Sequence, residues 1–154
     1  MKEPFAMTSK APFVAALALL AGLAPRPGLA EGSVRQVTDP VAKEECSACH
    51  MAYQPAFLPA ESWKKIFADL SNHFGEDASL DPKTEARIRN YYLRHAARWR
   101  SIPKPVPIRI TELPWFTREH TRFAARAKQD PKIGSLSNCT ACHRYAERGW
   151  FEND

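Results

Sequence analysis

The sequence is poor in the features that several large classes of protein require. Its apolar run at residues 13–24 is shorter than the about 20 residues that a membrane-spanning helix needs. It contains no phosphate-binding loop, no dinucleotide fingerprint and no serine, histidine and aspartate set typical of hydrolases. The formal net charge of +5 is a mild excess, well short of a nucleic-acid-binding signature. We therefore expect neither a nucleic-acid partner nor an integral membrane segment in the mature chain.

Cysteine is also scarce, and all four cysteines fall into two short motifs. Residues 46–50 read CSACH and residues 139–143 read CTACH, so both follow the pattern C-x-x-C-H. This pattern is typical of covalent haem attachment, because two thiols bond to one porphyrin while the adjacent imidazole reaches its iron. We predict two covalently bound haem c groups. The attachment residues would be the four thiols, Cys46, Cys49, Cys139 and Cys142. The proximal iron ligands would be His50 and His143.

The N-terminal 30 residues have the features of a cleaved secretory signal peptide. Lys2 and Lys10 flank the start, the apolar run follows, and Gly28 and Ala30 supply small residues at a cleavage site. An uncleaved anchor is the alternative, which the short run disfavours. Covalent haem attachment in bacteria takes place outside the cytoplasm, so we expect a periplasmic protein.

Paired cysteines have three other common uses: disulfides, a four-cysteine zinc site and a thioredoxin-like redox pair. A zinc site would require two motifs far apart in the sequence to converge, and both histidines would lack a role. A thioredoxin-like pair needs a β-α-β context, whereas this sequence is helical and broken by prolines. Two copies that end in histidine, in an exported chain, favour haem attachment.

Proline placement and apolar periodicity predict a mainly α fold, a small helical c-type cytochrome with little or no β structure. Asp39 and Asp81 each precede a proline as N-caps, so we expect helices at residues 40–50 and 82–99. Apolar stripes predict further helices at residues 60–74, ended by Gly75, and at residues 113–127.

Two haem-binding halves are expected within this fold. Prolines at every second position predict an extended connector at residues 103–107. It would join an N-terminal half, residues 31–102, to a C-terminal half, residues 108–154, in which Ser137 or Asn138 caps the helix that carries the second motif.

Few residue types in the sequence can bind the second face of each iron. Methionine is the usual partner in high-potential c-type cytochromes, but the expected mature chain contains only Met51, next to His50. Met51 cannot reach the opposite face of the same haem, although it could serve the other haem. Bis-histidine ligation at both irons is therefore expected. Three histidines on apolar stripes compete for the two distal positions, and the pattern eliminates none of them: His73, His95 and His120.

Several stretches of the sequence resemble the dihaem cytochrome c (DHC) family of small periplasmic cytochromes. They read CSACHMAYQP at residues 46–55, LPAESW at 58–63, DLSNHFGED at 69–77, ITELPWF at 110–116, EH at 119–120 and NCTACH at 138–143. Together these stretches span nearly all of the expected mature chain.

The resemblance implies that His73 and His120 are the distal iron ligands, which leaves His95 surplus, in the core or near a haem propionate. It also implies a one-electron carrier. Its partners would be membrane-linked donors, such as cytochrome b-type proteins, and a small oxygen-binding monohaem cytochrome c as acceptor. No catalytic residue is expected, because fully ligated irons leave no place for a substrate. The alternative is a small dihaem redox enzyme, of the peroxidase or nitrogen-oxide reductase type, with one displaceable distal ligand.

Overall fold

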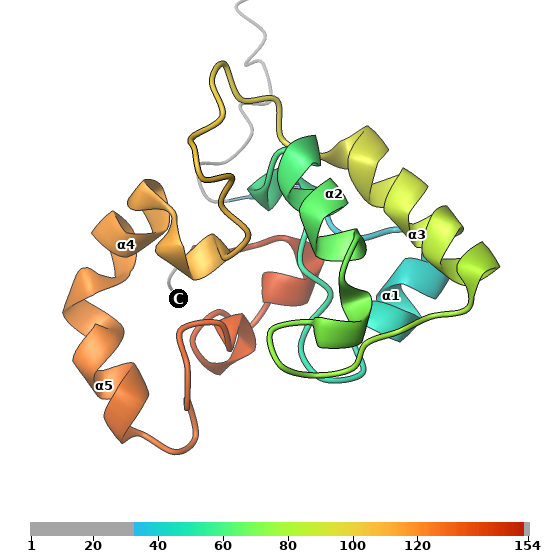
Figure 1. Ribbon diagram of the computed structural model, residues 1–154. Coiled ribbons are helices and arrows are strands. Elements are labelled where there is room, and N and C mark those ends of the chain that lie inside the picture. The colour runs from blue at the N-terminus through green and yellow to red at the C-terminus, as the bar shows by residue number, and fades with distance from the viewer. Residues whose placement is uncertain (1–32, 153–154) are drawn as a thin grey trace, which may run out of the picture.

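In the computed structural model, which describes residues 33–152, short helices form two groups joined by an irregular connector (Figure 1). The first group contains α1 Pro40–Cys46, α2 Ala60–Phe67 and α3 Pro82–His95. The second contains α4 Pro114–His120 and α5 Ala124–Gln129, and the C-terminal turns lie between the groups. Within the described residues β pairing is limited to isolated bridges, so the mainly α fold class is confirmed. The predicted signal peptide lies outside the described residues.

Six single 3-10 turns complete the described structure. They are Pro55–Phe57, Leu70–Asn72, Ile110–Glu112, Thr121–Phe123, Cys139–Ala141 and Ala146–Arg148. None of the helices between residues 33 and 152 is long and apolar enough to cross a membrane.

Two Asp-Pro pairs start helices, as predicted. The Asp39 carboxylate accepts hydrogen bonds from the backbone N–H groups of Val41 and Ala42, and so satisfies two donors at the start of α1. Asp81 does the same at the start of α3. Asp39 also forms an ion pair with Arg87 of α3, with 3.1 Å between nitrogen and oxygen, which links the two helices.

The protein core lies mainly between α2 and α3. Trp63 of α2 packs edge-on against Tyr92 of α3, with 4.6 Å between the ring centroids, and Phe67 packs on the same tyrosine. The Trp63 indole donates hydrogen bonds to the carbonyl oxygens of Pro55 and Leu58, which fixes the loop after the first motif. Leu113 and Phe116 of the second group extend this core.

The two ends of the described chain pair with each other. The backbone N–H of Val34 donates to the carbonyl of Gly149 over 2.7 Å, and Ser33 forms a bridge with Trp150. The buried Gln54 side chain donates to the carbonyl of Ala146. The C-terminal segment therefore packs against the first half of the protein.

Several predicted helices are shorter than expected. The helix predicted at residues 40–50 ends at Cys46, so its motif continues into a turn, and the second motif forms only the single turn Cys139–Ala141. The helix predicted at residues 60–74 ends at Phe67, where the backbone hydrogen bonds change to the shorter 3-10 spacing, and a tight turn follows at residues 73–76. The helix predicted at residues 82–99 ends at His95, and the helix predicted at residues 113–127 is divided by the 3-10 turn Thr121–Phe123.

Candidate functional site

The first motif lies where α1 ends. Cys46 is the last residue of the helix, and residues 47–50 turn away from it, so His50 is carried on a turn. The His50 Nδ1–H donates to the Met51 carbonyl over 2.8 Å, and the imidazole stacks on the Tyr53 ring at 4.7 Å between centroids. A histidine whose Nδ1 is held by a carbonyl presents Nε2 to a metal.

His73 faces His50. Their ring centroids are 6.1 Å apart and their planes are inclined by 28°. Burial, and then the neighbouring His50, lower the pKa of His73, which favours the neutral imidazole that a metal requires.

A tight turn holds His73 in this position. Its N–H donates to the Glu76 carbonyl and its carbonyl accepts from the Glu76 N–H, and Phe74 and Gly75 between them both take positive φ values. A positive φ is costly for a bulky residue such as Phe74. The Arg109 guanidinium covers the Phe74 ring at 4.3 Å, so a residue beyond the connector packs on this turn.

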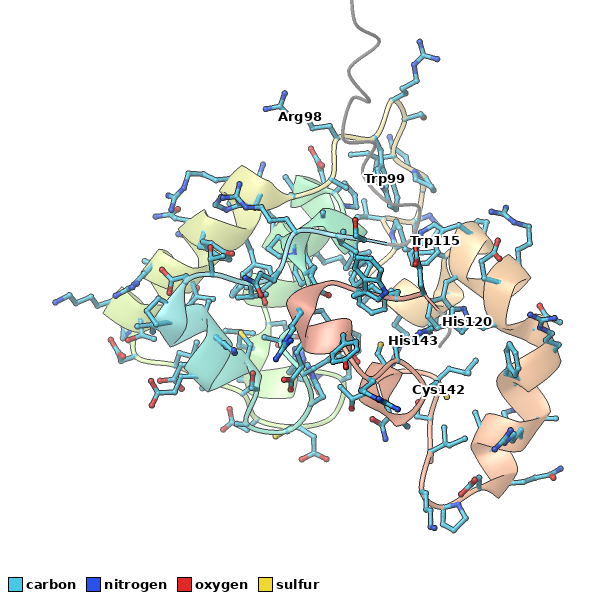
Figure 2. All side chains as sticks on the ribbon, turned by 180° about the vertical axis from the view of Figure 1, so that it is seen from behind. Arg98, Trp99, Trp115, His120, Cys142 and His143 are labelled. Carbon is cyan, nitrogen blue, oxygen red and sulfur yellow. The ribbon has the colours of Figure 1, made fainter. Side chains whose placement is uncertain are left out.

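The second motif has an equivalent arrangement. His143 follows the turn Cys139–Ala141, and His120 is the last residue of α4; their ring centroids are also 6.1 Å apart, inclined by 76°. Figure 2 shows these two side chains close together, with Cys142 beside them. Burial, and then His120, lower the pKa of His143, and a contact with the Glu152 backbone acts in the opposite direction.

His95 lies apart from these pairs. It is the last residue of α3 and half-buried, and its Nδ1–H donates to the Tyr91 carbonyl over 2.8 Å. Its ring contact is with Tyr91, at 4.5 Å between centroids, and not with a histidine.

The two motifs lie close to one another. A cavity of about 370 Å³ separates them, lined by Cys49, His50 and Met51 on one side and by residues 137–140 on the other. The Tyr53 hydroxyl donates to the Ser137 carbonyl over 2.6 Å. Burial raises the pKa of Tyr53 to about 12, so the phenol remains a donor at neutral pH.

None of the four cysteines forms a disulfide in this structure. Burial raises the pKa of Cys46 and raises that of Cys139 to about 11, so both are protonated at neutral pH. Among residues 33–152, no three cysteine, histidine, aspartate or glutamate side chains group as ligands of a metal ion, so the zinc alternative gains no support.

A sequence profile of one family, described as dihaem cytochrome c (DHC), matches residues 42–151. The chain belongs to the dihaem cytochrome c family. A search of curated proteins gave no significant match.

Solved structures of dihaem cytochromes c resemble this one closely. A crystal structure of DHC purified from Rhodobacter sphaeroides is 49% identical over 75% of this chain and 99% of that chain, with a TM-score of 0.63. A second structure of a diheme cytochrome c from Rhodobacter sphaeroides is 48% identical over 77% of this chain and 100% of that one, with a TM-score of 0.70. The diheme cytochrome from Shewanella baltica is 44% identical over 73% and 86%, with a TM-score of 0.65.

Members of this family bind two haem c groups covalently, and the site residues of this dihaem cytochrome c fit them. Metal–nitrogen bonds to histidine are about 2.0 Å long, so two imidazoles on opposite faces of one iron have centroids roughly 6 Å apart. Both histidine pairs have this spacing, and each pair includes the histidine of one C-x-x-C-H motif.

Four other aromatic residues at the site were not named as site residues from the sequence. Tyr53 and Phe116 stack on histidines, and Phe74 and Phe151 contact histidines edge-on. Phe116 precedes His120 by four residues on one predicted helix face, so its spacing did indicate a contact. Nothing in the local sequence indicated that Phe151 lies against His143.

Proposed function

We propose that this protein is a periplasmic one-electron carrier with two bis-histidine haem sites. In this proposal His50 and His73 ligate one iron, and His143 and His120 ligate the other. The thioether bonds are formed by Cys46 and Cys49 in the first site and by Cys139 and Cys142 in the second.

The spacing of the histidine pairs carries this proposal. Two independent pairs, each 6.1 Å between centroids, match the separation of two imidazoles on one iron. His95 has no such partner ring, and its contact with Tyr91 supports a packing role. Two ligands on every iron leave no open position for a substrate, which favours electron transfer over catalysis.

When bound, haem c supplies a one-electron iron couple. The chain's own residues hold the imidazoles in place through the hydrogen bonds and ring contacts at His50, His73 and His120. Histidine in place of methionine lowers the potential, so a low-potential carrier is expected. Its partners would be a membrane-linked cytochrome b-type donor and a small soluble, oxygen-binding monohaem cytochrome, which is the role that the family resemblance implies.

Absorption spectra of single histidine variants test the proposal. We expect the wild type to be low-spin in both oxidation states and not to bind carbon monoxide. His73→Ala and His120→Ala should each convert one of the two haems to a high-spin form that binds carbon monoxide, because each removes one axial ligand.

His95→Ala is the matched control and should remain low-spin. A wild type with a high-spin haem would instead favour the small redox enzyme with a displaceable ligand. A high-spin His95→Ala variant beside a low-spin His73→Ala variant would show that the ligands have been assigned wrongly.

A further inference from the structure

The two histidine pairs differ in the mutual orientation of their rings. The planes of His50 and His73 are inclined by 28°, so these rings are nearly parallel. The planes of His120 and His143 are inclined by 76°, so these rings are nearly perpendicular. The centroid separation is the same in both pairs, and the difference between the pairs therefore lies in ring orientation.

Ring orientation matters because imidazole donates π electrons only perpendicular to its own plane. Two parallel rings act on the same iron d orbital and separate its energy from that of the second d orbital of π symmetry. Two perpendicular rings act on different orbitals, whose energies then stay close together. A protein tunes the electronic state of a haem partly through its axial ligands, and the orientation of the ligand rings is part of this control.

Phe116 is stacked face to face on His120. The two rings are parallel to within 7°, with 3.9 Å between centroids, and both residues lie on α4 four positions apart. The Phe116 carbonyl also accepts the His120 Nδ1–H over 2.9 Å. Phe116 is only 4% exposed, so its own ring is held by the core and cannot follow a rotation of the histidine.

In the first site, Tyr53 is the residue whose ring stacks on a histidine. The Tyr53 ring stacks on His50 at 4.7 Å with the planes inclined by 24°, and the Tyr53 hydroxyl is anchored on the Ser137 carbonyl. Tyr53 follows its histidine by three residues, whereas Phe116 precedes its histidine by four. Each site therefore has its own ring stacked on one of its histidines.

We propose that Phe116 is a positioning residue that sets the ring plane of His120 and so gives the second haem site an electronic structure distinct from that of the first. This inference rests on the proposed bis-histidine ligation. It assigns to Phe116 a role in the iron's electronic state beyond its contribution to the core.

Electron paramagnetic resonance of the ferric, haem-loaded protein tests this role. The wild type should give two different low-spin signals, a rhombic one from the parallel pair and a highly anisotropic one from the perpendicular pair. Phe116→Leu keeps the carbonyl and much of the apolar volume but removes the flat face. It should shift or broaden the anisotropic signal and leave the rhombic one unchanged.

Three further variants make the result specific. Tyr53→Leu should move the rhombic signal, and Phe116→Tyr, which retains a flat ring, should preserve both signals. Phe67→Leu is the control. The Phe67 ring is buried and packs on Tyr92, and in the described part of the chain it forms no ring contact with a histidine. This variant should therefore preserve both signals as well.

Two like low-spin signals in the wild type would overturn the inference, even if Phe116→Leu failed to take up haem. Unchanged signals in Phe116→Leu, or an equal shift in Phe67→Leu, would also overturn it. A high-spin signal in the wild type is a separate outcome, because it contradicts bis-histidine ligation and hence the proposed function itself.

Discussion

At the scale of single residues, Gly149 occupies a position that a side chain cannot share. Its φ is +82°, and a Cβ atom there would lie 1.7 Å from the Val34 carbonyl oxygen. The clash is with backbone, so no side-chain rotation relieves it. The pairing of the two ends of the described chain therefore requires glycine at this position.

We expect Gly149→Ala to destabilise the haem-loaded protein by more than about 2 kcal/mol, since the Val34–Gly149 pairing must open. Gly134→Ala is the matched control. Gly134 also has a positive φ, of +67°, but a Cβ atom added there would meet nothing within 4 Å, so only the backbone cost of about 1 kcal/mol applies. Urea unfolding measures both; equal losses would contradict the proposed clash.

The sequence predicts the site residues whose role is local chemistry. The C-x-x-C-H spacing singles out four cysteines and two histidines without knowledge of the fold. The distal positions could be narrowed only to His73, His95 and His120, because facing an iron is a long-range property. The family resemblance selects His73 and His120, and the structure brings these two beside the motif histidines.

At the scale of secondary structure elements, the Asp-Pro pairs offer a direct comparison. Asp39 and Asp81 cap α1 and α3 in the same way, but only Asp39 also pairs with an arginine of another helix among the ion pairs of residues 33–152. Asp39→Ala should lose about 1 kcal/mol for the cap and up to about 1 kcal/mol for the partly exposed ion pair. Asp81→Ala should lose less. Urea midpoints at neutral pH measure the difference, and a larger loss in Asp81→Ala would contradict the link between helices.

The effect of Asp39→Ala should also depend on pH. The hydrogen bond from the Ala42 backbone, and then the bond and charge of Arg87, hold the pKa of Asp39 below its ordinary value of 3.8. The folded state therefore favours the carboxylate, whose contribution is complete above the unfolded-state pKa and is lost as the pH falls through the folded-state pKa. The destabilisation by Asp39→Ala should shrink when unfolding is measured below about pH 4.

Helix starts were predictable and helix ends were not. A capping aspartate and a following proline act within one turn, so α1 and α3 begin where the sequence indicates. The end of α2 depends on the turn at residues 73–76 and on the hydrogen bond from the Ala78 N–H to the Leu70 carbonyl. Apolar spacing alone continued this helix through His73, because it does not detect such contacts.

At the scale of the whole molecule, the two groups of helices differ in how much protein they bury. Most of the buried cluster belongs to the first group, whereas α4 buries only Phe116 and α5 only Ala127 among the described residues. The folded state of a segment as short as the second half is only marginally stable unless it buries further apolar surface. The second half should therefore depend more strongly on its haem.

The double variant Cys139→Ser and Cys142→Ser tests this dependence. Without the second attachment we expect limited proteolysis to cut first within residues 114–137, while the first haem retains a low-spin spectrum. The wild type should resist the same treatment. Early cleavage within α2 or α3, or undiminished resistance in the variant, would contradict the difference between the halves.

The hydrogen bond between Val34 and Gly149 joins a segment that is synthesised early to one that is synthesised late. A chain grows from its N-terminus, so residues 33–37 remain without this partner until residue 149 has been synthesised. The first motif is complete long before then, and the second motif, which ends at His143, is complete only a few residues before it. The pairing of residues 33–34 with residues 149–150 can therefore form only in a chain that already contains both motifs, and we expect a truncated chain that ends before Gly149 to lack it.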